Sequence, residues 1–272
     1  MKGERRPSGH LMLISLQRVF YAGLLGRPRG KTSGGFHIYC ALEGSLTVTR
    51  EGRSNGPTTM AVVPPYVSHT VVSDHPTVVC VIIEPETVPS ADLAGLASRL
   101  AGPDGAVVRQ RIGAVYDAIR AGVLRPAEMS TAEFDRMIFG AALAPRRLDP
   151  RVATAVVRLV ENPERPMAAE DCARAAGLSQ SRFLHLFKDE TGVSFRAFRA
   201  WKRARHLLHF VNEEINFAHL AQDIGYPDST HFSHSIRRFY GLKPRAIFTG
   251  SRDLAIYRSE TSTDRQPLVA SA

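Results

Sequence analysis

Residues 177–192 read GLSQSRFLHLFKDETG, and residues 225–241 read GYPDSTHFSHSIRRFYG, so the last third of the chain contains one pattern twice. The leading glycines are 48 residues apart and the closing glycines are 49 apart. Each leading glycine can end a short helix at low conformational cost, and Ser179 or Asp228 can then cap the next helix. The repeat therefore predicts two helix-turn-helix units, each with a polar and basic outer face on its second helix.

A strongly basic stretch joins the two copies. It covers residues 194–211 and contains five cations and no acidic residue: Arg196, Arg199, Lys202, Arg203 and Arg205. Apolar residues such as Phe195, Phe198 and Leu207 recur between the cations at helical spacing. We therefore expect one long helix between the two units, which presents its cations to an anionic backbone such as that of DNA.

The composition of the whole chain agrees with an anionic partner. The formal net charge is +9, and the positive excess falls in residues 1–60 and 150–250, whereas the middle of the chain is slightly acidic. No run of about 18 apolar residues indicates a membrane span, and the first residues lack the features of a signal peptide. The three cysteines lie far apart, as expected for reduced thiols in a cytoplasmic protein.

Hydrophobic periodicity divides the chain into parts. Short β-branched runs separated by turn residues are typical of a small barrel or sandwich, and from about residue 91 the apolar spacing becomes helical. We expect an α+β protein whose C-terminal domain has its own core and folds alone. Its four parts are a small barrel at 1–90, a helical connector at 91–149, a double helix-turn-helix domain at 150–252 and a disordered tail at 253–272.

The C-terminal third resembles the DNA-binding domain of the AraC/XylS family of bacterial transcription regulators. The likeness spans about Met167 to Thr249 and rests on Gly-Leu-Ser-x-Ser at 177–181, Leu-Phe-Lys-x-Glu-Thr-Gly at 186–192, Gly-Tyr-x-Asp at 225–228, His-Phe-Ser at 231–233 and Phe-Tyr-Gly-x-x-Pro at 239–244. Cys172 and Ile236 depart from the family's usual leucine and phenylalanine, but both remain apolar. The resemblance implies a sequence-specific regulator of transcription, associated with the bacterial nucleoid, and leaves open whether it is an activator or a repressor.

The resemblance also implies which positions contact DNA. The two recognition helices would enter successive major grooves on one face of the duplex. The positions implied for base contacts are Ser181, Leu184, His185, Ser229, Thr230, Ser233 and His234. The positions implied for phosphate contacts are Arg182, Arg199, Lys202, Arg203, Arg237 and Arg238.

The N-terminal half resembles the cupin barrels that AraC-like proteins often carry as sensors. Residues 36–48 resemble the first cupin motif and residues 62–69 resemble the second. A sensor barrel implies a pocket for a small-molecule effector; the alternative is a barrel used only for dimer contacts or for docking on the DNA-binding domain. The candidate lining residues are Phe36, His37, Tyr39 and His69.

A metal-dependent enzyme is the main alternative to a regulator. A cupin enzyme holds its metal through histidines and a carboxylate, for which the sequence offers His37, Glu43 and His69. Tyr39 stands where the second histidine of the usual pair would be, so we assign no metal, cofactor or catalytic residue. A nucleoid or RNA-binding protein that uses charge alone is a second alternative, and it would show no sequence preference.

We expect a regulator without enzymatic activity. Its expected partners are duplex DNA and a small-molecule effector, and none is a membrane. A homodimer is left open, and RNA polymerase is a further partner if the protein activates transcription.

Overall fold

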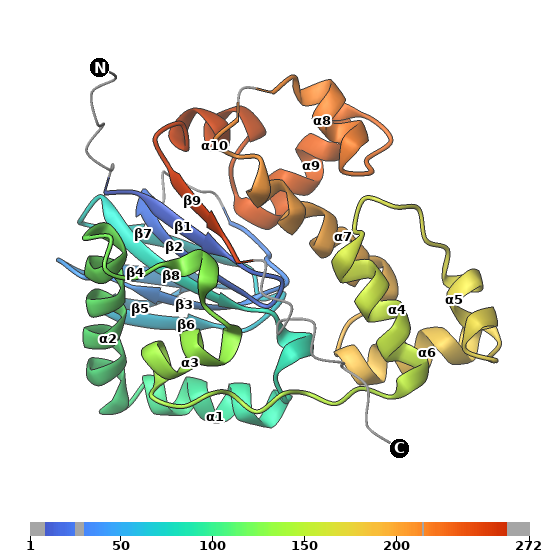
Figure 1. Cartoon of the computed structure of the whole chain (residues 1–272), viewed down its shortest axis with the longest axis horizontal. Helices are drawn as coiled ribbons and strands as arrows, with labels where there is room; N and C mark the ends of the chain where they lie inside the picture. Colours follow the sequence, from blue (N-terminus) through green and yellow to red (C-terminus); the bar gives the residue numbers. More distant parts are fainter. Residues whose placement is uncertain (1–8, 25–29, 214, 260–272) are drawn as a thin grey trace.

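The computed structural model describes residues 9–24, 30–213 and 215–259, and it joins an N-terminal half built on sheets to a helical C-terminal half (Figure 1). The expected α+β fold class is therefore confirmed. The strands are β1 (Leu11–Ile14), β2 (Arg18–Leu24), β3 (Phe36–Cys40), β4 (Leu46–Arg50), β5 (Arg53–Thr58), β6 (Met60–Val63), β7 (His69–Ser73), β8 (Thr77–Ile83) and β9 (Ala255–Arg258). Across the described ranges, no helix combines the length and the apolar character that crossing a bilayer requires.

The strands form two sheets and not the closed barrel that the cupin resemblance implied. Six strands follow the order β6-β3-β8-β2-β1-β9, and three follow the order β5-β4-β7. The larger sheet ends at β6 and β9 and does not close on itself. Strand β9 lies parallel to β1 and occupies its outer edge, so β1 is not available to pair with the smaller sheet.

Strand β9 also corrects the expectation of a disordered tail after residue 252. Its four residues pair with β1 in the register Leu11↔Ala255 to Ile14↔Arg258. A strand this short shows no convincing period of its own, and its stability comes from a neighbour at the other end of the chain. The rest of the predicted tail, residues 260–272, lies outside the described residues.

Helices cover one face of the six-stranded sheet. They are α1 (Ser90–Leu100), α2 (Asp104–Arg120) and α3 (Thr131–Phe139), with short 3-10 turns η1 (Pro85–Thr87) and η2 (Pro126–Glu128) beside them. Side chains alternate across a strand, so Phe36 and Ile38 of β3 pack in the core beneath these helices, while Tyr39 packs in the core on the opposite face. The helical connector expected at 91–149 is thus a layer of the N-terminal half.

The C-terminal half contains two helix-turn-helix units. Its elements are α4 (Pro150–Glu161), α5 (Ala169–Ala175), α6 (Gln180–Thr191), α7 (Phe195–His206), η3 (Leu207–His209), α8 (Phe217–Asp223), α9 (Ser229–Tyr240) and α10 (Pro244–Gly250). We call α5 and α6 the first unit, and α8 and α9 the second unit. The long helix expected over residues 194–211 is α7, and it ends earlier, in the 3-10 turn η3.

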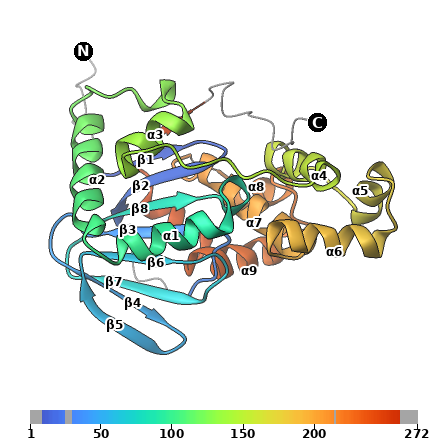
Figure 2. The ribbon, with the colours of Figure 1, turned by 90° about the horizontal axis from the view of Figure 1, so that it is seen from below.

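The two units belong to different hydrophobic cores. The first unit shares a core with α4 and with Phe195 and Phe198 of α7. The second unit shares a core with Trp201 of α7 and Leu207 of η3, and this core continues into the uncovered face of the six-stranded sheet. In Figures 1 and 2 the first unit accordingly projects away from the sheets, whereas the second unit lies over the larger one.

Candidate nucleic-acid interface and interdomain cavity

Helix α6 presents a polar face to solvent. It begins after Ser179, whose hydroxyl accepts a hydrogen bond from the backbone N–H of Arg182, and it ends at Gly192 with a φ of +78°. Phe183 and Phe187 are fully buried on its inner face. The three positions expected to contact bases are all exposed on the outer face: Ser181, Leu184 and His185.

Helix α9 repeats this arrangement. The Asp228 carboxylate accepts hydrogen bonds from the backbone N–H groups of Thr230 and His231, both at 2.8 Å, and Gly241 ends the helix with a φ of +71°. Phe232, Ile236 and Phe239 are buried. Of the positions expected to contact bases, three are exposed and Ser233 is half-buried; the exposed ones are Ser229, Thr230 and His234.

The arginines expected at phosphates fall into two groups. Arg182, Arg237 and Arg238 have exposed side chains on the recognition helices. Arg199 and Arg203 of α7 are half-buried and donate hydrogen bonds to backbone carbonyls in the segment that joins α4 to α5. The second pair therefore stabilises the loop that leads into the first unit in this structure.

Lys202 does not face DNA in this structure, which corrects its expected role at a phosphate. Its side chain is 3% exposed, and its ammonium group contacts the carboxylates of Glu84 and Glu86, the latter at 2.6 Å. Arg205 reaches Glu84 at 2.5 Å, and the Trp201 indole N–H donates to Glu84 at 2.9 Å. Helical spacing places a cation on one side of a helix, but it does not reveal which distant segment will cover that side.

These five residues form a buried cluster that fastens α7 to the end of strand β8, and we call it the α7 clamp. Burial alone would raise the pKa of Glu84, but Lys202 and Arg205 outweigh that effect and hold the pKa below its ordinary value. Burial raises the pKa of Glu86, which lies farther from Arg205. Glu84 is therefore the anion on which the clamp depends. No sequence motif marked it, although the run Glu84-Pro85-Glu86 follows a buried strand directly.

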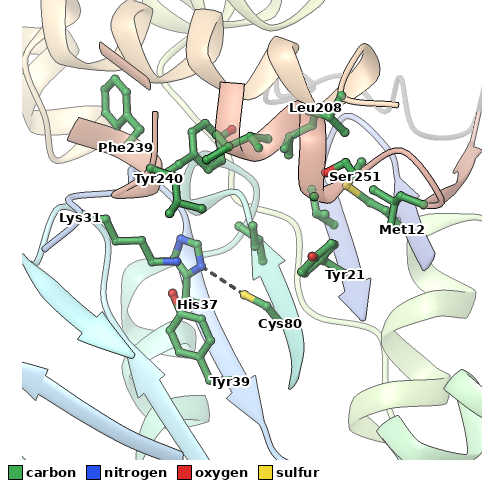
Figure 3. A pocket seen from close by; sticks show the side chains of 18 residues that line it. Met12, Tyr21, Lys31, His37, Tyr39, Cys80, Leu208, Phe239, Tyr240 and Ser251 are labelled. Atoms are coloured by element: carbon green, nitrogen blue, oxygen red, sulfur yellow. Dashed lines mark hydrogen bonds between the residues drawn. The ribbon is translucent and has the colours of Figure 1, made fainter. Parts of the chain in front are cut away.

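A cavity of about 230 Å³ lies between the six-stranded sheet and the second unit (Figure 3). Its sheet wall is formed by Met12, Val19, Tyr21, Lys31, His37, Tyr39, Cys80 and Ile82. Its opposite wall is formed by Leu208, Val211, Phe239, Tyr240, Leu242, Ala246, Ile247, Gly250, Ser251 and Leu254. Most of these side chains are apolar, and the cavity lies outside the sheet and not within a barrel.

Two of the four residues expected to line an effector pocket reach this cavity. His37 and Tyr39 line it, whereas His69 lies behind Tyr39 and bonds its hydroxyl at 2.8 Å. Phe36 is a correction, because its side chain packs under helices α1 to α3 on the other face of the sheet. The period of two in a strand predicts that neighbours Phe36 and His37 cannot share a face.

Lys31 is the charged group of the cavity wall. It lies 5.1 Å from the centre of the Tyr39 ring, and among the described residues no carboxylate pairs with it. Burial lowers the pKa of Lys31 and holds the pKa of His37 well below its ordinary value, so His37 is neutral near pH 7. Burial also raises the pKa of the Cys80 thiol to about 12, and its sulfur lies 3.4 Å from His37 Nδ1.

Of the three residues considered for a cupin metal, His37 and His69 come together, with their ring centres 5.9 Å apart, but Glu43 does not join them. The Glu43 side chain is 76% exposed, lies 3.2 Å from His75 and does not line the cavity that contains His37. Within the described part of the chain, no three histidine, cysteine or acidic residues are placed to hold a metal ion.

Comparisons with known proteins identify the C-terminal units. Residues 172–249 match a family model described as a helix-turn-helix domain. Over 97 residues the chain is 24% identical to an uncharacterized HTH-type transcriptional regulator of Haemophilus influenzae, a match that covers 35% of this chain and only 33% of that relative.

Solved structures of ToxT from Vibrio cholerae have a similar fold over most of the chain. The structure from strain O395 has a TM-score of 0.53 at 13% identity and covers 86% of this chain and 98% of that one. A second ToxT structure, in the P21 form, has a TM-score of 0.52 at 11% identity and covers 86% of this chain and 98% of that one. The similarity therefore includes the sheet-containing half as well as the helical half.

The repeated units, the exposed recognition helices and the family match define the C-terminal half as a double helix-turn-helix domain. It is a domain of the AraC type, attached to an N-terminal half that shares the ToxT fold.

Proposed function

We propose that this protein is a sequence-specific, DNA-binding transcription regulator whose DNA binding responds to a small molecule held in the interdomain cavity. The observation that supports DNA binding most strongly is the pair of recognition helices. Both are capped by the side chain of the preceding residue, both bury their phenylalanine side chains, and both leave a polar face exposed. A helix of this kind fits the major groove, where base edges present a distinct pattern of donors and acceptors.

The exposed arginines on those helices supply the electrostatic part of the proposal. Replacing Arg182 or Arg237 by glutamine is expected to flatten the salt dependence of DNA binding, because each arginine that neutralises a phosphate releases a counterion. The slope of log K against log salt should fall by about 0.9 for each arginine removed. Binding titrations at several salt concentrations would measure this slope.

Arg53→Gln is the matched control for the salt experiment. It removes the same charge from an exposed position on β5, away from the recognition helices, and should leave the slope unchanged. An equal change in all three variants would show that only net charge matters, which contradicts phosphate contacts at Arg182 and Arg237.

The cavity lining indicates the chemistry of the effector. The walls are mainly apolar, and Lys31 provides a buried cation without a carboxylate partner among the described residues. A buried charge is costly unless it is paired, so a ligand that brings an anionic group would relieve this cost. The proposed effector is therefore a small, mostly apolar molecule with a carboxylate or similar group.

Lys31→Met is expected to weaken binding of such an effector by about 10- to 100-fold, the usual range for a lost hydrogen bond to a charged group. The probes are small aromatic and aliphatic carboxylates, and the readouts are thermal stabilisation and titration calorimetry. Each carboxylate is compared with its uncharged amide, and Lys188→Met provides a control at an exposed lysine of the first unit. Equal binding of acid and amide to the unaltered protein would contradict the assigned role of Lys31.

The proposal places the protein at bacterial nucleoid DNA in the cytoplasm. RNA polymerase is a further proposed partner if the protein activates transcription. A homodimer is also expected, and sedimentation of the intact protein would test it.

A further inference from the structure

We propose that the interdomain cavity controls the second helix-turn-helix unit selectively, by setting its position relative to the first unit. This inference rests on the proposed function of the cavity as an effector site and adds how occupancy reaches DNA. It predicts that the two halves of a bound DNA site respond differently to a filled cavity.

The walls of the cavity show which unit can respond. Every lining residue outside the N-terminal half belongs to η3, to α9, to α10 or to the segments that adjoin them. Within the described part of the chain, helices α4, α5 and α6 contribute none. A ligand therefore touches the second unit directly, and it reaches the first unit through α7 and through the loop before α5, where Glu164 lies against Gly225.

Helix α7 separates the two units mechanically. Its first half packs with the first unit through Phe195 and Phe198, and its second half packs with the sheet and the second unit through Trp201 and Ala204. The α7 clamp, centred on Glu84, lies between these halves and holds the helix to the N-terminal half. The α7 clamp therefore resists movement of α7 when a ligand displaces the residues that line the cavity, and this limits the movement of the first unit.

The recognition helix of the second unit extends directly into the cavity wall. Phe239 and Tyr240 form the last turn of α9 and line the cavity, while His234 lies nearer its exposed start. The Tyr240 hydroxyl donates to the backbone carbonyl of Ala204 in α7 at 3.0 Å. A helix of 12 residues is about 18 Å long and moves nearly as a rigid rod, so a shift of Tyr240 also moves the base-reading face.

The chain after α10 closes the same cavity and returns to the sheet. Ser251 and Leu254 line the cavity, and the next residue, Ala255, begins strand β9 beside β1. On the other side, the Thr32 N–H donates to the carbonyl of Arg238 in α9 at 2.7 Å. The second unit is therefore attached to the sheet on two sides of the cavity, and the size of what fills the cavity can determine its position.

The test fills the cavity in the intact protein without requiring a ligand. Leu208→Trp adds volume from η3, and Ile247→Trp adds it from α10, so that one variant remains if the other does not fold. Val72→Trp, at a position on β7 that is 67% exposed, is the control for adding a tryptophan. The probes are the duplex recovered by site selection and two derivatives in which one half-site is scrambled.

A filled cavity is expected to change affinity for the intact duplex by about 5- to 150-fold, the usual range of coupling between sites. Affinity for the duplex that lacks the second unit's half-site should stay within about 2-fold of the unaltered protein, since only the first unit reads it. Equal changes in affinity for the intact duplex and for the duplex that lacks the second unit's half-site would contradict selective control of the second unit. That result would still be consistent with regulation by an effector. No change in either duplex, from a folded variant, would contradict both the inference and the proposed role of the cavity.

Discussion

Exchanging Glu84 for glutamine is expected to lower the free energy of unfolding by about 3 to 5 kcal/mol, the range seen when one partner of a buried ion pair is removed. The Glu84 carboxylate contacts Lys202 and Arg205 and accepts a hydrogen bond from Trp201. All of these groups are buried, so water cannot hydrate the cations that would be left without their carboxylate partner. Chemical denaturation followed by circular dichroism would measure the change.

Glu86→Gln is the matched control, because it removes an equally buried carboxylate from the same cluster. Glu86 contacts Lys202 at 2.6 Å but does not reach Arg205, and burial raises its pKa. A neutral side chain is better tolerated at this position, so the free energy of unfolding is expected to fall by less than about 1.5 kcal/mol. Equal costs for the two variants would show that the clamp does not depend on Glu84 in particular.

Isolating residues 150–252 is expected to leave the first helix-turn-helix unit folded and the second unit unstable. The sequence repeat suggested a domain with a core of its own, but the structure gives the second unit a core that it shares with the sheet. The fragment would expose Trp201 and Leu207 and would leave Lys202 without Glu84. Burying a large apolar side chain contributes about 1.5 to 3 kcal/mol, so losing several such contacts exceeds the usual stability of a small domain.

Amide hydrogen exchange on the fragment and on the intact protein would show this difference. Protection should persist in α4 and α6, whose core with Phe183 and Phe187 lies within the fragment except for Leu148. Protection in α8 and α9 should fall to that of an unfolded peptide. Similar protection in both units of the fragment would restore the independent domain that the sequence predicted.

The sequence predicted what depends on nearby residues. The caps at Ser179 and Asp228, the glycines that end each recognition helix and the exposed base-reading faces all follow from patterns within about 17 residues. Such features are predictable because the hydrogen bonds and the apolar faces that stabilise them are local. The α+β class and the AraC-type domain could be inferred for the same reason.

What the sequence could not show depends on distant partners. Lys202 looked like a phosphate contact because its partner Glu84 is 118 residues away. Strand β9 had no visible signal because it gains its hydrogen bonds from β1 at the start of the chain. Part of the sheet wall of the cavity could be predicted, because the alternation of side chains along β3 places His37 and Phe36 on opposite faces. The helices that form the opposite wall could not be predicted.

Selection of binding sites from a random duplex library tests the central claim, that two recognition helices read two half-sites. The intact protein should return a motif with two half-sites about one helical turn, or about 10 base pairs, apart. His185→Ala should relax preference in only one half-site and His234→Ala only in the other, each by about 1 to 3 kcal/mol of base discrimination. Both side chains are exposed on their helices, so neither change should disturb the fold. Loss of preference at the same base pairs in both variants, or no motif at all, would contradict this account.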